Sequence, residues 1–567
     1  MRHSVASLAV YLRLFLVPIS LAQFVTLAGG QGSSLAATVR NIATYGATAN
    51  DGIDDLSAIT AAINDALPGD TVYLPSGAFS ISGSIVAKSG IIIAGAGRDN
   101  TIVQFIGASG NPMISLANVS NVEVAGLTLD GNNNNNAWQG INAANGSGDY
   151  LHDLRVENLV GSNFGPHGIY FSSGVTDSKI IGNEFSNIGT GSEWGAGIRF
   201  SQGSSRNQAI GNTITNTGRG GILANNDSTD LVIRNNTIKG SGGVGLGIEV
   251  WHGCDRAVIE NNNLDHWLSV DGSSMVAVRR NTISDTSGIV KFAGLEFATG
   301  GSDNVFTDNV VNGGAQVGIS VSNINVKQRV YWAHNTIEDA QSFGVQIQGE
   351  SDGAKQMYFY ANNIQDNQGH GFRFNGNSQL MVLDGNQITG NAGIGLQSGD
   401  GSTLDKLMVV NNTISGNTGP AFTADYGSPG PFQGSNLLWQ NNTVSGNGNN
   451  YQPPSKGSFF DNLPMVDIDA PIDTNIGAPV AFSLNYSGPQ SIANVLWDLG
   501  DGLPETISNP LHIYSEAGTY RVGLVVWDAL GRAAHDEIML TVAVPEPAMV
   551  ILFAIAGLCL LFVRRCK

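Results

Sequence analysis

An asparagine followed two positions later by an apolar residue recurs through the middle of the chain. Successive members lie 19 to 30 residues apart, which is close to one coil of a β-helix. The eleven members are Asn183, Asn212, Asn236, Asn262, Asn281, Asn309, Asn335, Asn362, Asn386, Asn412 and Asn442. In a parallel stack of coils these side chains align into a ladder in which each amide bonds the next. The pattern therefore predicts an all-β parallel β-helix with structural asparagines.

A short strand of the form Gly-apolar-x-apolar accompanies each repeat, as at Gly197 and Gly247. Alternation along such a strand sends the apolar residues inward and the x position outward. Taken coil by coil, the predicted outward column is Asn142, Tyr170, Arg199, Leu223, Glu249, Ser269, Glu296, Ser320, Gln346, Arg373 and Gly395. The next outward position adds Asn225, Trp251 and Asp271.

Residues 38–110, ahead of the repeats, predict a cap for the open end of the β-helix. Residues 55–67 are expected to be helical and to cover the first coil, which protects its edge. The apolar face of this helix consists of Ile59, Ala62, Ile63 and Ala66.

Residues 71–77 (Thr-Val-Tyr-Leu-Pro-Ser-Gly) and 91–97 (Ile-Ile-Ile-Ala-Gly-Ala-Gly) carry a resemblance to a known family. They resemble the N-terminal part of the pectate-lyase-like superfamily, which includes rhamnogalacturonases, glycan epimerases and phage tailspikes. Residues 126–131 are similar to the early coils of that family. The resemblance implies a right-handed parallel β-helix, here expected over 38–450, that binds or acts on polysaccharide.

The pattern changes after a linker expected at 451–465 to alternating strands over 466–543. The signature of the PKD domain is similar to the motif Trp497-Asp-Leu-Gly-Asp-Gly, to Tyr520 and to the dipeptide Trp527-Asp528. That resemblance implies an immunoglobulin-like β-sandwich, in which Trp497 and Tyr520 are expected in the core.

Both ends of the chain look like targeting signals. Residues 1–36 have basic residues, an apolar run and small residues, as a secretory signal peptide does. Residues 544–567 contain Pro545, Glu546 and Pro547, then sixteen apolar or small residues and an Arg cluster. This tail resembles the PEP-CTERM sorting signal, which implies cleavage by an exosortase-type protease. We expect export, transient inner-membrane anchoring and a cell-surface or extracellular destination; a plain tail anchor is the alternative.

Composition supports a mostly β protein and narrows its partners. The chain has 74 glycines but only 13% charged residues, which suits short strands and turns better than helices. The formal net charge of −19 repels phosphates, so we expect no nucleic-acid partner. Cys254 is the one cysteine ahead of the C-terminal tail and is expected to be an inert core residue.

Three carboxylates of the outward columns are candidate catalytic residues. Glu249 and Glu296 lie two coils apart, roughly 9 to 10 Å, with Asp271 in the coil between them. Carboxyl groups about 6.5 to 9.5 Å apart suit an inverting glycoside hydrolase, because a water fits between base and sugar. The competing interpretation is a solvated strand face, in which charged residues have no catalytic role.

Five further residues are candidates for binding sugar. Arg199 offers a planar fork for a carboxylate, and Trp251 offers an aromatic face for a pyranose. The predicted binding residues are Arg199, Trp251, His252, Tyr170 and His167. The segment around His167 is only weakly similar to the His motifs of polygalacturonases and alginate epimerases, and the paired Asp of polygalacturonases is missing.

Three functions stay open at this point. The hypothesis favoured is a glycoside hydrolase acting on an extracellular polysaccharide. A lyase or uronate epimerase is the second, with Lys291, His252 or His167 as base and a cation to neutralise the uronate. A non-catalytic polysaccharide-binding or adhesive surface protein is the third. No metal site is assigned, although one bound Ca²⁺ stays open as a cofactor. A trimer also stays open as the oligomeric state, but no residue pattern indicates it.

Overall fold

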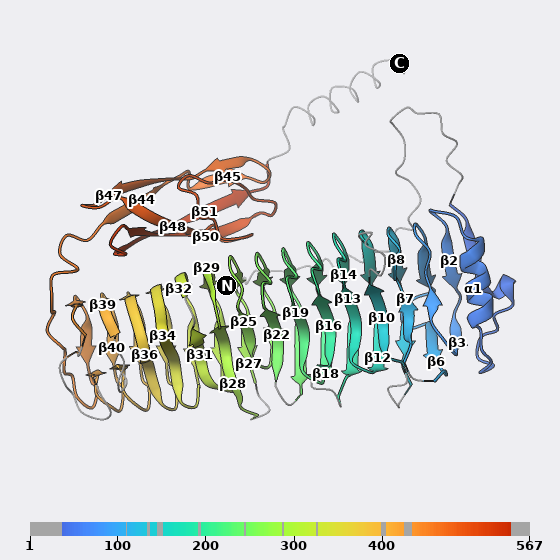
Figure 1. Cartoon of the computed structure of the whole chain (residues 1–567), viewed down its shortest axis with the longest axis horizontal. Coiled ribbons are helices and arrows are strands. Elements are labelled where there is room, and N and C mark those ends of the chain that lie inside the picture. Colours follow the sequence, from blue (N-terminus) through green and yellow to red (C-terminus); the bar gives the residue numbers. More distant parts are fainter. Residues whose placement is uncertain are drawn as a thin grey trace, which may run out of the picture. The chain divides into compact units, whose positions relative to one another are not determined.

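The computed structural model describes residues 37–545 apart from 109, 133–136, 145–150, 191–193, 243–244, 286–288, 325–326, 399–403, 425–431 and 433. A stack of β-coils comes first in the chain and a β-sandwich follows it (Figure 1). The expected signal peptide at 1–36, and Glu546 and Pro547 of the expected sorting motif, lie outside the described residues. No helix among the described residues has the length and apolar character to cross a membrane.

The β-helix has three parallel sheets, here called faces I, II and III. Face III is a 15-stranded sheet, and faces I and II form one 28-stranded sheet because β34 and β36 run through both. Face I contains β4 Ile85–Val86, β7 Pro112–Ser115, β10 Gln139–Ala144, β13 His167–Ser172, β16 Ala196–Ser201, β19 Gly220–Asn225, β22 Leu246–Trp251, β25 Leu268–Asp271, β28 Lys291–Ala298, β31 Ala315–Ile324, β38 Leu396–Ser398, β41 Phe422–Thr423 and the first parts of β34 Phe343–Tyr360 and β36 His370–Asp384.

Face II contains the second parts of β34 and β36 together with β1 Val39–Asn41, β2 Thr71–Leu74, β5 Ile92–Gly95, β8 Val122–Ala125, β11 Leu154–Glu157, β14 Lys179–Ile181, β17 Gln208–Ile210, β20 Val232–Arg234, β23 Val258–Glu260, β26 Ala277–Arg279, β29 Gly301–Thr307, β32 Lys327–Ala333, β39 Leu404–Val410 and β42 Leu437–Gln440. Face III contains β3 Gly77–Ile81, β6 Thr101–Phe105, β9 Thr128–Asp130, β12 Val160–Phe164, β15 Glu184–Ile188, β18 Thr213–Thr217, β21 Thr237–Ser241, β24 Asn263–Leu264, β27 Thr282–Ser284, β30 Val310–Asn312, β33 Thr336–Glu338, β35 Asn363–Gln365, β37 Gln387–Thr389, β40 Thr413–Ser415 and β43 Thr443–Ser445.

The predicted asparagine ladder is confirmed at the turn between faces II and III. All eleven members take part, and each side-chain amide donates to the side-chain oxygen of the next coil's asparagine at 2.9 to 3.0 Å. The same oxygen accepts the backbone N–H of the preceding ladder residue, as in Asn309 to Asn335 at 3.1 Å. Because these turns are buried, the ladder supplies partners for backbone groups that water cannot reach.

The residue before each ladder asparagine explains the frequent Asn-Asn pairs. Asn235, Asn261, Asn411 and Asn441 have φ between 56° and 58°, the left-handed region. Asparagine tolerates this conformation better than most residues. The first asparagine of a pair therefore makes the turn, and the second joins the ladder.

A second ladder was not predicted from the sequence. Asn367, Asn391, Asn417 and Asn447 form it at the turn between faces III and I, with amide-to-oxygen distances of 2.8 to 2.9 Å. Their spacing of 24, 26 and 30 residues repeats that of the first ladder and could have revealed them.

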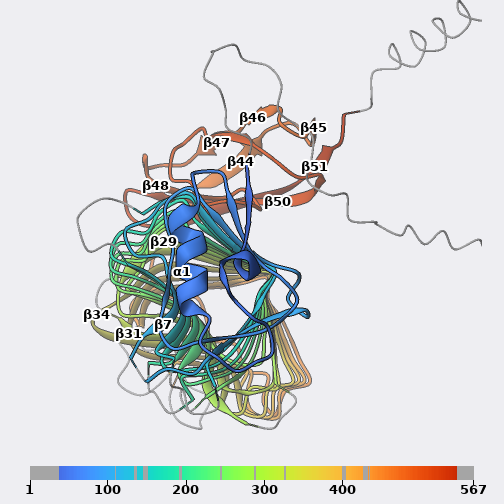
Figure 2. The same cartoon turned by 90° about the vertical axis from the view of Figure 1, so that its right-hand side faces the viewer.

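The N-terminal cap is confirmed. The α1 helix (Leu56–Asp65) and the η1 turn (Ile42–Tyr45) lie over the end of the coil stack (Figure 2). Ile59 and Ala62 are fully buried in the same core as the coils, so the helix closes the open end as expected.

The C-terminal domain has its own core and the expected sandwich strands. They are β44 Met465–Asp469, β45 Asp473–Asn475, β46 Pro479–Ala481, β47 Ser483–Ser487, β48 Ile492–Asp498, β49 Leu511–Ile513, β50 Gly518–Asp528 and β51 Ala533–Ala543. Trp497 is fully buried in this core, as predicted, and donates its indole N–H to the carbonyl of Ile507 at 3.0 Å. Tyr520 packs against the core but stays half-buried.

The sheet of β48, β50 and β51 packs on the outer surface of face II. Outward residues of the coils, including Val305, Tyr331 and Tyr358, form one buried cluster with Val525 and Trp527 of the sandwich. A fully buried ion pair anchors this contact: Arg279 lies 2.6 Å from Asp498, which also accepts the hydroxyl of Thr307 at 2.8 Å.

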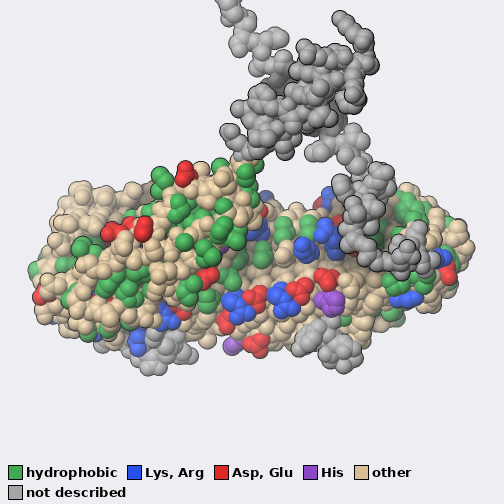
Figure 3. All heavy atoms as spheres, turned by 90° about the horizontal axis from the view of Figure 1, so that it is seen from above, with side chains coloured by type: hydrophobic (Ala, Val, Ile, Leu, Met, Phe, Trp, Pro, Cys, Tyr) green, Lys and Arg blue, Asp and Glu red, His purple; other side chains and the backbone are tan. Residues whose placement is uncertain are grey.

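Charged side chains lie on the coils that the sandwich leaves uncovered (Figure 3). Figure 3 shows basic and acidic side chains in a row on the side of the molecule that faces up in Figure 1. Asp177 pairs with Arg206 one coil on, and Asp230 pairs with Arg256 in the same way. The apolar outward residues therefore coincide with the docked sandwich, and paired charges cover the coils beside it.

His535 lies at the centre of the docking contact. Its ring packs 4.0 Å from that of Tyr360, and its Nε2 lies 2.8 Å from the hydroxyl oxygen of Tyr331. Burial lowers the pKa of His535 to about 3. The ring is thus neutral in the docked state at any physiological pH.

We expect loss of one ladder residue to destabilise the β-helix. Asn335→Ala would leave the carbonyl of Phe306 without its donor and two N–H groups of Asn309 without their acceptor. Each unsatisfied buried group costs about 1–3 kcal/mol, so the free energy of unfolding should fall by roughly 3 kcal/mol or more. Thermal and urea unfolding would measure this. The exposed Asn312→Ala is the matched control, and an equal loss in both variants would contradict the ladder's role.

Docking of the sandwich should weaken in acid. The pKa of His535 is depressed from an unfolded value of about 6.5, so the stability it permits is complete above that value and falls as pH drops toward about 3. Small-angle scattering should show the domains separating over this interval. His535→Gln keeps an acceptor for Tyr331 and removes the titration, so an unchanged pH profile in this variant would contradict the assignment.

Candidate functional site

The predicted outward column of face I is confirmed by the strand register for ten of its eleven positions. Each pair of neighbours from Asn142 to Arg373 is aligned in adjacent strands. The last position is wrong, because Arg373 aligns with Gln397 and not with Gly395. Two glycines, Gly393 and Gly395, precede apolar residues there, and the strand begins after the second.

Glu296 on β28 is the most strongly perturbed carboxyl group of this column. One of its oxygens accepts the indole N–H of Trp267 at 3.1 Å and the hydroxyl of Ser269 at 2.8 Å, and the other accepts the hydroxyl of Ser322 at 3.0 Å. Burial raises the pKa of Glu296, and the nearby charge of Asp271 raises it further, against the effect of these donors. Hydroxyls can accept as well as donate, so both serine contacts suit a protonated or an ionised carboxyl group.

Asp271 lies in the second outward column, one coil before Glu296. It follows Trp251 in that column and precedes Ala298, and it is half-buried. Its Oδ1 atom is buried and has no hydrogen-bond partner among the residues that the structure describes. A carboxylate with an unmet acceptor beside a raised-pKa carboxyl group is unusual, because buried polar atoms are normally paired.

Glu249 has a different environment from the one expected of a catalytic residue. Arg219 binds both of its oxygens, at 2.8 and 3.2 Å, and only 10% of the Glu249 side chain is exposed. A bidentate ion pair holds this side chain in place.

Aromatic and cationic side chains surround the carboxylates. The ring of Trp194 is 46% exposed, and the guanidinium groups of Arg199 and Arg219 lie 5.5 and 4.8 Å from its centre. Trp251 lies 6.3 Å from the same ring. Arg199 donates to the side-chain oxygen of Asn225 at 3.2 Å, and its burial lowers its pKa. The cluster presents flat apolar surface and hydrogen-bond donors together, which is the chemistry of sugar recognition.

The structure places the remaining predicted residues around this cluster. Tyr170 precedes Arg199 in the column and packs on His167 with ring centres 4.9 Å apart. Burial and the charge of Arg199 lower the pKa of His167 to about 3, so this ring is neutral. His252 is exposed, with its ring 4.3 Å from that of Trp251. Lys291 donates to the carbonyl of Gly242 at 2.9 Å.

The sequence predicts that Cys254 is an inert core residue, and it assigns no metal site. Cys254 is fully buried in the core, as predicted, and burial raises the pKa of its thiol to about 12. Over the described part of the chain, no three His, Cys, Asp or Glu side chains gather as ligands of one metal ion.

Sequence reasoning missed Trp194, Arg219 and Trp267. These residues lie in or next to the turns that enter face I, where the strand pattern gives no outward position. Each of them lies one to three residues before a Gly-apolar-x-apolar strand or its equivalent. A search of those positions in the sequence could have identified them.

Family models match three parts of the chain. A model of the right-handed β-helix region matches residues 112–283 and 220–379, and one of rhamnogalacturonase A/epimerase, pectate lyase-like, matches 39–120. A model of the PKD domain matches 461–544.

Individual relatives match shorter segments. A preneck appendage protein of Bacillus phage PZA is 29% identical over 156 residues, 25% of this chain and 18% of that protein. Mannuronan C5-epimerase AlgE4 of Azotobacter vinelandii is 29% identical over 167 residues, 25% of this chain and 30% of that protein. This chain thus spans less than a third of these curated relatives. The solved A-module of mannuronan C-5 epimerase AlgE6, also from A. vinelandii, covers 73% of this chain and 99% of its own length at 20% identity and a TM-score of 0.40.

The fold and the family models define the class of the body: it is a right-handed parallel β-helix with a pectate-lyase-like N-terminal segment. More particularly, the chain joins an N-terminal segment of the rhamnogalacturonase A/epimerase type to a C-terminal PKD domain.

We expect Arg219 and Glu249 to stabilise face I as a pair. Arg219→Met would leave a largely buried carboxylate without its partner and should cost about 3 kcal/mol of unfolding free energy. The double variant Arg219→Met/Glu249→Leu should recover most of that loss, as measured by thermal unfolding. Equal stability of the single and double variants would show that the pair is not coupled.

Proposed function

We propose that this protein acts on an extracellular polysaccharide held across face I and hydrolyses it as an inverting glycoside hydrolase. The observation that carries the proposal is Glu296: a buried carboxyl group with a raised pKa, beside the half-buried Asp271, which aligns with Trp251 of the aromatic and cationic cluster. A general acid needs a raised pKa to hold its proton near neutral pH.

In this proposal Glu296 protonates the glycosidic oxygen as the bond to the anomeric carbon breaks. Asp271 accepts a proton from the water that attacks that carbon from the opposite side. One coil step of about 4.8 Å and two residues along the strand separate their Cα atoms by roughly 8 Å. Side chains on the same face of a sheet project in nearly the same direction, so this Cα separation is compatible with the roughly 6.5 to 9.5 Å between carboxyl groups of inverting enzymes. Glu249 becomes a positioning residue, since Arg219 engages both of its oxygens.

The sugar chain lies along the aromatic residues in this proposal. Trp194 and Trp251 supply stacking surface, and Arg199, fixed by Asn225 and Trp194, supplies donors for hydroxyls or a uronate carboxylate. Tyr170, His167 and His252 lie at the edges of the same surface. Export through the N-terminal signal, and surface sorting by an exosortase-type protease, would place the protein beside such a polymer.

A uronate lyase or epimerase is the second candidate. It is favoured by the relatives whose names identify them as mannuronan C5-epimerases. In that case the neutral His167 would be the base and Arg199 would neutralise the uronate carboxylate, since His167 contacts the ring of Tyr170, which aligns with Arg199 in the next coil.

The test is turnover of a panel of pectic, alginate and bacterial exopolysaccharides by the full-length chain. For an inverting hydrolase we expect new reducing ends without ultraviolet absorbance from unsaturated uronate. Glu296→Gln and Asp271→Asn should each lower kcat by at least about 10²-fold, because each removes a proton-transfer group. Glu249→Gln should lower stability more than kcat.

The other outcomes separate the alternatives. Ultraviolet gain, or inversion of uronates without cleavage, that is lost in His167→Ala and kept in Glu296→Gln would replace the hydrolase with a lyase or epimerase. Binding of a polymer without any turnover, lost in Trp194→Ala, would establish an adhesive protein and exclude catalysis at Glu296. Asn312→Ala, on face III, is the control that should change nothing.

A further inference from the structure

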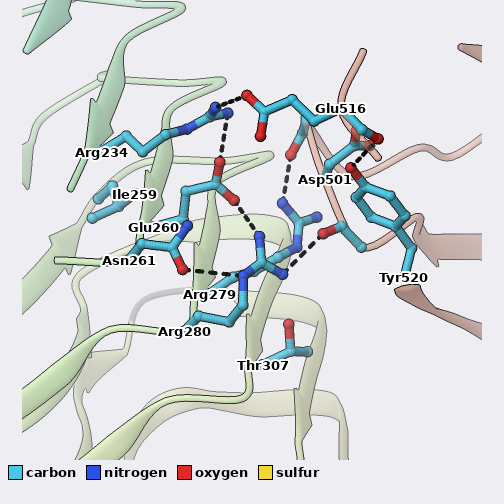
Figure 4. Close-up of polar contacts among 12 residues, drawn as sticks. Arg234, Ile259, Glu260, Asn261, Arg279, Arg280, Thr307, Asp501, Glu516 and Tyr520 are labelled. Atoms are coloured by element: carbon cyan, nitrogen blue, oxygen red, sulfur yellow. Dashed lines mark hydrogen bonds and ion pairs between the residues drawn. The ribbon is translucent and has the colours of Figure 1, made fainter. Parts of the chain in front are cut away.

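A polar cavity lies at the junction of the PKD domain and face II. Its volume is about 200 Å³. The lining residues come from both domains and are Arg234, Asn235, Glu260, Asn261, Arg280, Asp501, Ser515, Glu516 and Tyr520. Figure 4 shows the arginines and Glu260 on the coils facing Asp501, Glu516 and Tyr520 of the sandwich. We call it the junction pocket.

The junction pocket is held rigidly by the contacts beneath it. Arg279 is fully buried and bonds Asp498 and the carbonyl of Gly502, and Arg280 donates to the carbonyl of Gly500 at 3.0 Å. These sandwich residues belong to the Asp-Leu-Gly-Asp-Gly turn of the PKD signature. A pocket whose walls are fixed before binding loses little entropy when a ligand enters.

The charges that line the pocket are already paired. Glu260 accepts from Arg234 and Arg280, each at 2.6 Å, and is buried. Asp501 bonds His512 at 2.6 Å, and Glu516 lies 3.3 Å from Arg234. With two guanidinium groups against three carboxylates, the pocket has no excess positive charge to attract a uronate or phosphate. Its carboxylates are engaged, so it lacks the free ligands that a metal ion requires.

We propose that the junction pocket binds one neutral sugar ring of a polysaccharide chain. The amide groups of Asn235 and Asn261 and the hydroxyl of Ser515 line the pocket and suit vicinal sugar hydroxyls, because both kinds of group donate and accept. Tyr520 supplies a ring for stacking: one side packs on Tyr514, with centres 4.4 Å apart, and the residue also lines the pocket. The volume is below the roughly 300–1,000 Å³ of sites for drug-sized ligands, which suits a single ring.

The pocket and the face I cluster share coils but not surfaces. β22 and β23 are consecutive strands of one coil; β22 carries Glu249 on face I and β23 carries Glu260 on face II. The same holds for β25, with Asp271, and β26, with Arg279. The junction pocket is thus a second anchoring site. It rests on the proposed function only for the class of ligand.

Titration calorimetry with the full-length chain tests the proposal, using neutral trisaccharides of glucose, mannose, galactose and xylose, and trigalacturonate for comparison. We expect a neutral trisaccharide to bind and Tyr520→Ala to weaken binding on the order of tenfold, the loss of one stacking contact. Tyr520→Phe should retain most of the affinity. Asn235→Gly keeps the left-handed backbone of Asn235, removes its amide and should also weaken binding.

The controls separate this site from face I. Tyr486→Ala alters another half-buried tyrosine of the same domain and should leave affinity unchanged. Binding that survives Tyr520→Ala and is lost in Trp194→Ala would place the sugar on face I and overturn the junction pocket. Absence of binding by all four neutral trisaccharides, or binding of trigalacturonate alone, would overturn it too. Turnover at Glu296 is measured separately, so failure of either proposal leaves the other standing.

Discussion

The asparagine ladder is the constraint on which the rest of the molecule depends. Parallel coils bury their own turns, and a buried backbone N–H or carbonyl must find a partner inside the protein. A single residue type meets this need at the same place in every coil from Asn183 to Asn442. Because each amide bonds its counterpart in the next coil, the ladder also fixes the register of one coil on the next. A slip by one residue would break every ladder bond and reverse the inward and outward positions.

A fixed register is why the outward column of face I could be predicted from the sequence. Glu249, Ser269 and Glu296 align as expected because the ladder and the Gly-apolar-x-apolar strands set the same period. The repeat period does not predict where side chains in the turns point, because the turns vary in length from coil to coil. Trp194, Arg219 and Trp267 therefore escaped prediction, although they determine what each carboxylate does. Arg219 turns Glu249 into half of an ion pair, and Trp267 helps to hold Glu296 in a buried position.

For the sandwich, too, the local sequence predicts the fold but not the long-range contacts. Its fold follows from a local signature, and Trp497 lies in its core as that signature predicts. Its docking on face II depends on residues about 200 positions apart, such as Arg279 and Asp498. The outward residues of face II change from charged, at Arg155 and Lys179, to apolar, at Val305 and Tyr331. That change marks a covered surface, but it does not say what covers it.

The middle coils, from β19 to β29, contain the buried charged groups whose removal from water costs free energy. Burying the Arg219–Glu249 pair on face I and the Arg279–Asp498 pair on face II removes charges from water, and such pairs seldom repay that cost by themselves. Glu296 and Asp271 add two more carboxyl groups, one of them with an unmet acceptor. The coils can hold these groups because the ladder and the apolar core continue through them without interruption. A fold whose stability comes from repetition can therefore concentrate polar groups on its outer faces without losing its register, and the same coils can serve face I on one side and a docked domain on the other.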